Sequence, residues 1–184
     1  MRLRAATPAD AADIAEIYAA FVIGTAVSFE IEPPGEAAMR LRMAAGDDLY
    51  PWLVGEEEGA ILGYAYSARF RERTAYRFAV ETSVYLRSDA RGRGLGRQLY
   101  EPLLTTLEAQ GFTQAIAAIT LPNEASVRLH ESLGFERAGT YRQVGWKLDA
   151  WHDVGLWQRA LAASASPPAE PKPPQMEPKP SRRA

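Results

Sequence analysis

The sequence contains no cysteine and only two histidines, His130 and His152, among its 184 residues. The absence of cysteine excludes disulfide bonds, thiolate metal sites and catalysis through an acyl-cysteine intermediate. No apolar run approaches the roughly 18 residues that a membrane-spanning helix needs. Asp10, Asp13 and Glu16 stand where a signal peptide would be apolar. We therefore expect a soluble cytoplasmic protein that has no membrane partner and no metal site.

The chain also lacks an excess of positive charge, with 21 basic against 23 acidic residues and a net charge of −2. A dedicated nucleic-acid-binding protein is normally basic, so nucleic acid is not an expected partner. An arginine-rich nucleic-acid module remains an alternative, which a steep salt dependence of DNA binding would support. The length fits one domain with a substantial core, with or without a tail.

Proline is concentrated near the C-terminus, where seven of the 13 prolines lie between residues 167 and 180. The segment 163–184 has no aromatic residue and too little apolar surface to offset the entropy lost on ordering. The sequence predicts one domain over residues 1–162 and a disordered, proline-rich tail over residues 163–184. The tail carries a charge of +2, so the domain carries −4. Deleting the tail should leave the melting temperature and the activity almost unchanged.

Helical and strand patterns alternate along the predicted domain. Helices are predicted to begin at Pro8 and Glu36 and to cover residues 94–110 and 125–133, with a kink or a lost hydrogen bond at Pro102. Strands are predicted over residues 1–5, 52–55, 61–67, 78–86, 114–120, 135–144 and 152–159. This order indicates an α/β (α+β) fold with a mixed sheet.

A glycine-rich turn, Arg91-Gly92-Arg93-Gly94-Leu95-Gly96, joins the strand ending in Val84-Tyr85-Leu86 to the next predicted helix. Glycine lets backbone N–H groups approach an anion closely, and the helix N-terminus adds free donors and a positive dipole end. Together these features favour a pyrophosphate site. The spacing matches neither the dinucleotide-binding GxGxxG pattern nor a P-loop. An arginine-rich surface turn is the alternative without function.

This strand, turn and helix resemble the acyl-CoA signature of the GNAT family of N-acetyltransferases, and Asn123 with the residues up to Phe135 resembles a later family motif. The resemblance implies a mixed, mostly antiparallel sheet of about seven strands flanked by about four helices. It also implies that an extended pantetheine arm pairs with the strand like an added β-strand. The implied acetyl-CoA-binding residues are Val84, Tyr85, Leu86, Arg91, Gly92, Arg93, Gly94, Leu95, Gly96 and Asn123.

Further segments, from about residue 3 to residue 160, resemble the phosphinothricin N-acetyltransferase subfamily, among them Tyr50-Pro51-Trp52-Leu53-Val54 and Trp151-His152-Asp153-Val154-Gly155. This resemblance implies a homodimer that uses acetyl-CoA to acetylate the primary amine of a small amino-acid-like substrate, with phosphinothricin (glufosinate) as the first expectation. Methionine sulfone or sulfoximine is an alternative acceptor, because relatives with similar motifs acetylate these amines. A non-catalytic acyl-CoA-binding sensor is an alternative of another class.

Direct acetyl transfer needs a base for the substrate ammonium and a proton for the leaving thiolate. Glu81 is the candidate base, because the subfamily resemblance places an active-site glutamate there; an ordinary edge carboxylate is the alternative. Strand alternation puts Glu81 and Val84 on opposite faces unless a bulge intervenes. His130 stands where many GNAT enzymes carry a tyrosine proton donor, and it could give or take a proton. Helix packing is the alternative role for His130, and a structural role is expected for His152.

The acidic groups of phosphinothricin favour arginine as a binding partner. Arg71 and Arg73 align with basic positions of the subfamily's substrate loop, although a solvated loop is the alternative. The aromatic residues of the subfamily's substrate pocket align with Phe29, Tyr66, Tyr76 and Tyr85 of this sequence. Arg77 and Phe78 depart from the acid and tryptophan expected at these positions, which leaves the choice of substrate open. An aminoglycoside acceptor is disfavoured, since a cationic substrate calls for an acidic pocket.

Overall fold

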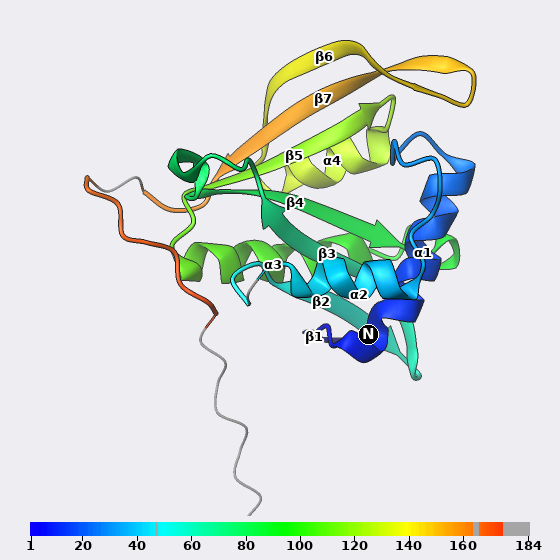
Figure 1. Cartoon of the computed structure of the whole chain (residues 1–184), viewed down its shortest axis with the longest axis horizontal. Coiled ribbons are helices and arrows are strands. Elements are labelled where there is room, and N and C mark those ends of the chain that lie inside the picture. Colours follow the sequence, from blue (N-terminus) through cyan, green and yellow to red (C-terminus); the bar gives the residue numbers. More distant parts are fainter. Residues whose placement is uncertain (47, 164–165, 175–184) are drawn as a thin grey trace, which may run out of the picture.

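The computed structural model describes residues 1–46, 48–163 and 166–174. Its centre is a seven-stranded sheet in the order β1-β2-β3-β4-β5-β7-β6, in which only β4 and β5 are parallel (Figure 1). The strands are β1 (Arg2–Ala5), β2 (Trp52–Glu57), β3 (Ala60–Arg69), β4 (Ala79–Leu86), β5 (Gln114–Leu121), β6 (Glu136–Lys147) and β7 (Ala150–Ala160). The α-helices of the described residues are α1 (Ala11–Gly24), α2 (Glu36–Ala44), α3 (Leu95–Gln110) and α4 (Glu124–Ser132). The predicted fold class is confirmed.

Two apolar cores lie on opposite faces of the sheet. Helix α3 buries its predicted leucine stripe against one face, with Leu95 4% exposed and Leu99, Leu103 and Leu107 fully buried. Helices α1 and α2 cover the other face, where Ile14 and Met39 pack with Val54 and Tyr64. The sheet is therefore the middle layer of three, and each side chain of its central strands belongs to one of two environments.

Two prolines affect the helices, and only the helix start at Pro8 differs from the prediction. Pro8 begins a 3-10 turn, Pro8–Asp10, in which the Thr7 backbone N–H donates to Asp10 Oδ2 at 2.6 Å, and the α-helix starts only at Ala11. Helix α3 runs through Pro102 without a break, although proline cannot donate the usual hydrogen bond. The Pro102 carbonyl accepts a bond from Thr106 Oγ1 at 2.9 Å, so the following turn is maintained.

The last two strands are longer than the sequence predicts. Strand β6 continues to Lys147, and β7 begins at Ala150. In the turn between them, Leu148 and Asp149 have φ values of 51° and 55°. Non-glycine residues seldom adopt this left-handed conformation, so the sequence gives no turn signal at this point. The resulting β6–β7 hairpin extends beyond the rest of the sheet, with its tip beside the loop that follows α1 (Figure 1).

Residues 166–174 run along the domain. The Lys172 N–H donates to the Gln110 carbonyl at 2.9 Å, and Gln110 Nε2 donates back to the Lys172 carbonyl at 3.0 Å. Glu170 forms a two-pronged ion pair with Arg77. The boundary after residue 162 stays a prediction, and the end of the proposed tail, residues 175–184, lies outside the described residues.

None of the helices in the described part of the chain is both long enough and apolar enough to cross a bilayer.

Candidate active site

Strands β4 and β5 separate soon after they meet. Their parallel pairing is limited to Ala79–Glu81 on one side and Gln114–Ile116 on the other. Past this point a narrow cleft of about 50 Å³ lies between residues 82–85 and 117–120. The β4 edge that faces this cleft has no ladder partner on β5, so an extended ligand arm could pair with it as an added strand.

The glycine-rich turn lies between β4 and α3. Gly92 and Gly94 adopt φ of 74° and 73°, a left-handed conformation that glycine takes without strain. Gly96 lies where an added Cβ would be 3.2 Å from Leu129 Cδ2, so its role is to let α3 and α4 pack closely. The first bond across the helix start runs from the Gln98 N–H to the Gly94 carbonyl, which leaves the earlier N–H groups of the helix available for an anion.

The arginines near this turn are mostly engaged elsewhere. Arg93 donates to both carboxylate oxygens of Glu57, at 2.8 and 2.9 Å. Arg91 lies over the Phe21 ring at 5.0 Å, and no ion pair of Arg91 is found among the described residues. Leu95 is 4% exposed, so of the predicted acetyl-CoA-binding residues this one can offer only its backbone. A pyrophosphate here would be held chiefly by backbone N–H groups.

Asn123 and His130 both line the cleft from α4. Asn123 caps the helix, because its Oδ1 accepts from the Ser126 N–H at 3.2 Å. The amide NH₂ of Asn123 is the part of the side chain that can donate to a ligand. The resemblance-based placement of both residues at one cleft is therefore matched by the structure, while their chemical roles stay predictions.

His130 is 4% exposed and held in one orientation. Its Nδ1 lies 2.8 Å from the Ser126 carbonyl oxygen, which can only accept, so Nδ1 carries the proton. Nε2 is buried without a partner among the described residues and therefore presents a lone pair. Burial lowers the pKa of His130, which favours this neutral form. This arrangement leaves Nε2 able to accept a hydrogen bond, while the catalytic role of His130 stays a prediction.

Glu81 lies on the opposite face of β4 from Val84. The β3–β4 register is continuous, and it pairs Ala68 with Glu81, Tyr66 with Ser83 and Tyr64 with Tyr85. Directly paired residues share a face, so Glu81 lies on the α1–α2 side, while Val84 packs in the α3 core. Burial raises the pKa of Glu81, and the Arg71 guanidinium partly offsets this rise. A carboxylate in this environment is a stronger base than an exposed one.

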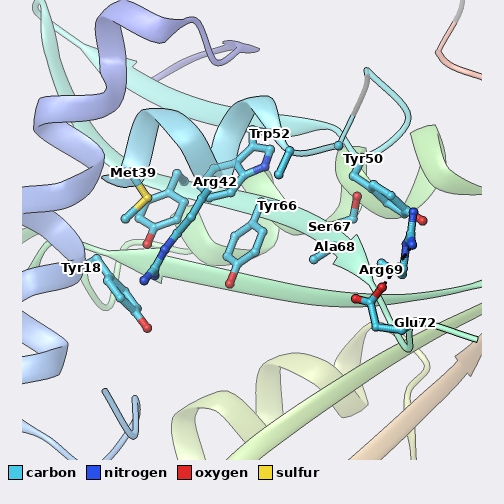
Figure 2. A pocket seen from close by; sticks show the side chains of 13 residues that line it. Tyr18, Met39, Arg42, Tyr50, Trp52, Tyr66, Ser67, Ala68, Arg69 and Glu72 are labelled. Atoms are coloured by element: carbon cyan, nitrogen blue, oxygen red, sulfur yellow. Dashed lines mark hydrogen bonds and ion pairs between the residues drawn. The ribbon is translucent and has the colours of Figure 1, made fainter. Parts of the chain in front are cut away.

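A larger pocket of about 550 Å³ opens on the same face of the sheet (Figure 2). Its floor is a row of aromatic rings, with Trp52 stacked on Tyr66 at 4.2 Å and near Tyr64 at 5.8 Å. Arg42 reaches from α2 into the pocket between Tyr18 and Tyr66. Ala68 lines the pocket and pairs directly with Glu81, so the pocket is next to the candidate base. The full lining is Tyr18, Met39, Arg42, Ala45, Gly46, Tyr50, Trp52, Tyr64, Tyr66, Ser67, Ala68, Arg69 and Glu72.

The predicted substrate residues are only partly brought together. Tyr66 lines the larger pocket, and Tyr85 lines the cleft. Arg71 lies close enough to Glu81 to affect its pKa. Neither of these two cavities is lined by Phe29, Arg71, Arg73 or Tyr76. Phe29 is 37% exposed and its ring packs against Gly145 of β6, while Tyr76 is 43% exposed with its edge against Phe70.

Several cavity residues have no signal in the sequence. Val27, from the loop after α1, lines the cleft. Met39 and Arg42 line the larger pocket from α2, where Arg42 also holds both carboxylate oxygens of Glu30 at 2.8 Å. The sequence predicts the helix but cannot predict which of its side chains faces the pocket, because that depends on how α2 packs against the sheet.

The comparisons with known proteins agree with this geometry. The family model for the acetyltransferase (GNAT) domain matches residues 3–156. The chain belongs to the GNAT acetyltransferase family. A phosphinothricin N-acetyltransferase of Streptomyces viridochromogenes is 42% identical over 167 residues, which cover 91% of this chain and 91% of the relative. The GNAT resemblance and the prediction of an enzyme are therefore confirmed.

Other GNAT relatives are named for a different acetyl acceptor. An L-methionine sulfoximine/L-methionine sulfone acetyltransferase of Salmonella typhimurium is 37% identical over 92% of this chain and 99% of its own. A solved phosphinothricin acetyltransferase of Sinorhizobium meliloti, in complex with acetyl-CoA, superposes with a TM-score of 0.87. It is 40% identical, and the match covers 95% of each chain.

Proposed function

We propose that this GNAT enzyme transfers the acetyl group of acetyl-CoA directly to the primary amine of a small amino-acid-like substrate, with phosphinothricin as the first candidate. The observation that carries the proposal is the position of Glu81. It lies at the last rung shared by β4 and β5, where the narrow cleft begins, and it pairs across β3–β4 with Ala68, which lines the larger pocket. A base at this junction can serve an amine in the pocket and a thioester in the cleft.

The cleft and the turn suit acetyl-CoA. The unpaired edge of β4 offers main-chain groups to an extended pantetheine arm, as β-augmentation requires. The free backbone N–H groups after Gly94 could hold the pyrophosphate, and the Asn123 amide could donate to the arm. The predicted acetyl-CoA residues Val84, Tyr85 and Asn123 all line this cleft.

The reaction makes a C–N bond, breaks a C–S bond and removes two protons from the substrate ammonium. We assign the first proton to Glu81, whose burial favours proton uptake. The amine then attacks the acetyl carbon. The second proton leaves nitrogen in the tetrahedral intermediate, is accepted by the free Nε2 of His130 and passes to the departing thiolate. No acyl-enzyme is needed, in keeping with a sequence that contains no cysteine.

The larger pocket and Arg71 fit an amino acid that carries an acid. Arg71 supplies a cation beside Glu81, and the stacked rings of Trp52, Tyr64 and Tyr66 supply an apolar floor. Methionine sulfoximine and methionine sulfone are the second candidates, because some relatives are named for these amines.

A free-thiol release assay with acetyl-CoA tests the proposal, with phosphinothricin and methionine sulfone compared side by side. Higher kcat/KM for phosphinothricin supports the first candidate. Turnover of the sulfone alone keeps the mechanism and overturns the substrate assignment. Acetyl-CoA binding without turnover of either amine would contradict this substrate class and favour the sensor alternative.

We also propose a cytoplasmic homodimer that associates through the outward face of the β6–β7 hairpin. Trp146 and Trp151 pair across this hairpin and are 55% and 58% exposed, and their rings meet edge to face at 5.4 Å. Val144 and Leu148 extend the same exposed apolar surface, and such patches mark association sites more often than free surface. Light scattering should show a dimer, and Trp146→Arg should shift it to the monomer.

A further inference from the structure

Tyr100 of α3 is fully buried, and it contacts two residues that line the β4–β5 cleft from different elements. Its hydroxyl oxygen lies 2.6 Å from Oγ1 of Thr82 on β4. Its ring meets the imidazole of His130 on α4 edge to face, with 5.0 Å between the ring centres. One side chain of the α3 core therefore joins the strand side of the cleft to the helix side.

The Thr82 hydroxyl extends this contact to β5, because Oγ1 donates to the Ile116 carbonyl at 3.3 Å. A carbonyl oxygen can only accept, so the Tyr100 hydroxyl is the donor in its bond with Thr82. Burial raises the pKa of Tyr100, which keeps this donor protonated at neutral pH. Ile116 forms the last β4–β5 pair with Glu81. The two hydroxyls thus connect α3, β4 and β5 at the point where the strands separate.

Burial makes this arrangement specific. Thr82 is 2% exposed and Tyr100 is 0% exposed, so bulk water cannot replace either hydroxyl partner. An unpaired buried hydroxyl is unfavourable, and a displacement of β4 along β5 would break these bonds. The imidazole is held as well, because Phe135 stacks on Tyr100 at 5.8 Å and meets His130 edge to face at 5.1 Å. Tyr100 and Phe135 therefore limit how the imidazole can turn, in addition to the Ser126 carbonyl.

We propose that Tyr100 and Thr82 are positioning residues of the acetyl-CoA cleft, whose hydroxyl pair sets where β4 and β5 separate and where His130 stands. This inference rests on the proposed function, because that function places acetyl-CoA in the cleft. Tyr100 is fully buried and touches no reacting atom. The effect falls mainly on acetyl-CoA and less on the amine, since Tyr100 and Thr82 meet on the α3 side of the sheet and line no part of the larger pocket.

The first test is a double-mutant cycle of Tyr100→Phe and Thr82→Val, which remove the hydroxyls and keep the shapes of the side chains. Each substitution should raise the dissociation constant for acetyl-CoA about tenfold, and the double variant should bind no more weakly than either single variant. Thr82→Ser keeps the hydroxyl and should bind within about twofold of the wild type. Additive effects of the two substitutions would overturn the inference.

Thr113→Val is the matched control. Thr113 Oγ1 donates to the Phe78 carbonyl at 3.2 Å, so this variant loses the same kind of bond at the other end of the β4–β5 ladder. Thr113 lines neither cavity. The dissociation constant for acetyl-CoA should stay within about twofold of the wild type. A rise as large as that of Thr82→Val would overturn a specific role for the Tyr100–Thr82 pair.

The second test needs no cofactor and follows the imidazole signals of the chain's two histidines by NMR. Thr82→Val leaves the Tyr100 ring intact, so a shift of the His130 signals reports movement of the imidazole and not the loss of a neighbouring ring. His152 lies on β7 and does not line the cleft, so it is the internal control. Unchanged His130 signals in Thr82→Val would overturn the positioning of His130.

The two proposals fail in different ways, and Ala118→Trp separates them. Ala118 is exposed and lines the cleft from β5, so a large ring at this position should fill the cleft. If this variant binds acetyl-CoA as the wild type does, the placement of acetyl-CoA in the cleft is overturned, and the NMR test alone decides the positioning of His130. If it loses binding while Tyr100→Phe and Thr82→Val keep it, only the positioning role is overturned.

Discussion

Glu81 and Ile116 form the last pair of the parallel β4–β5 ladder. One strand therefore carries a half-buried carboxylate to the point where the sheet opens. Beyond this pair the main chain of β4 faces the cleft, whereas the side chain of Glu81 faces the α1–α2 layer. Donor and acceptor can thus approach the same residue from different directions, which is the geometric requirement of direct transfer.

Glu81→Gln should lower kcat about 10²- to 10⁴-fold, the usual contribution of general-base catalysis. The dissociation constant for acetyl-CoA should stay within about twofold, because the side chain lies on the α1–α2 side of the sheet, away from the α3 core. Steady-state kinetics and calorimetric titration check both parts. Glu108→Gln on the exposed face of α3 is the control. An unchanged kcat would remove Glu81 from the mechanism.

The same variant should unfold at a higher temperature than the wild type at neutral pH. Burial raises the pKa of Glu81 above its ordinary value of 4.5, so the folded state binds more protons than the unfolded state in the interval between the two values. The contribution of Glu81 to the free energy of unfolding is therefore fully present at low pH, and it is lost as the pH rises through the pKa that Glu81 has in the folded state. Thermal unfolding at pH 4 and pH 7 should show the gain only at pH 7.

The acid side of the pH profile should depend on two titrating groups, Glu81 and His130. Burial raises the pKa of Glu81 above 4.5 and lowers that of His130 below 6.5. The kcat/KM for the amine should therefore rise with pH in two steps, one as Glu81 loses its proton and one as His130 loses its proton. Glu81→Gln should remove the first limb and His130→Gln the second. A profile that keeps both limbs in either variant would contradict these assignments.

Gly94→Ala should weaken acetyl-CoA binding and reduce the free energy of unfolding by about 1–2 kcal/mol. An added Cβ meets nothing within 4 Å, so the cost comes from the left-handed backbone at φ of 73°. Gly24→Ala is a matched control, since it has equal space and an ordinary φ. Chemical denaturation and titration with acetyl-CoA measure the two effects. Equal destabilisation by both substitutions would show that backbone conformation is not the cause.

The hydrogen bonds between Lys172 and Gln110 revise the expectation from the sequence that deletion of residues 163–184 leaves the melting temperature almost unchanged. The deletion should lower the unfolding free energy by about 1 kcal/mol, the usual net contribution of a hydrogen bond. Gln110 is 5% exposed, and its Nε2 would lose the Lys172 carbonyl while keeping that of Leu49. The exposed Arg77–Glu170 pair should add little. Turnover should match that of the full chain, and a loss of turnover would show that these residues act on the site.

The sequence predicted those parts of the fold that depend on local patterns. The leucine stripe of α3 and the glycine-rich turn are examples, because periodicity and backbone freedom belong to a single segment. The turn at Leu148 and Asp149 was not predicted, since leucine rarely adopts the left-handed conformation, although aspartate tolerates it. There, pairing between β6 and β7 overrides the local preference.

In the candidate site, too, residues that depend on a local pattern could be predicted, whereas contacts between distant segments could not. Candidates on one strand or turn, such as Glu81 and Gly94, were predicted from spacing and resemblance. The contact of Phe29 with Gly145 joins distant segments, and no local pattern encodes it. Arg73 resembled a binding residue, but its position on an exposed loop depends on how that loop folds.

The open rungs of β4 have a consequence for how this enzyme family can diversify. Main-chain atoms are the same whatever the side chains are, so substitution cannot easily erase the part of the site that would receive the thioester arm. The proposed acceptor side, the larger pocket, is lined by side chains from α1, α2, β2 and β3. Mutations can therefore accumulate there and change the amine while the donor side persists. Relatives named for different acceptors, 37% and 42% identical to this chain, fit that asymmetry.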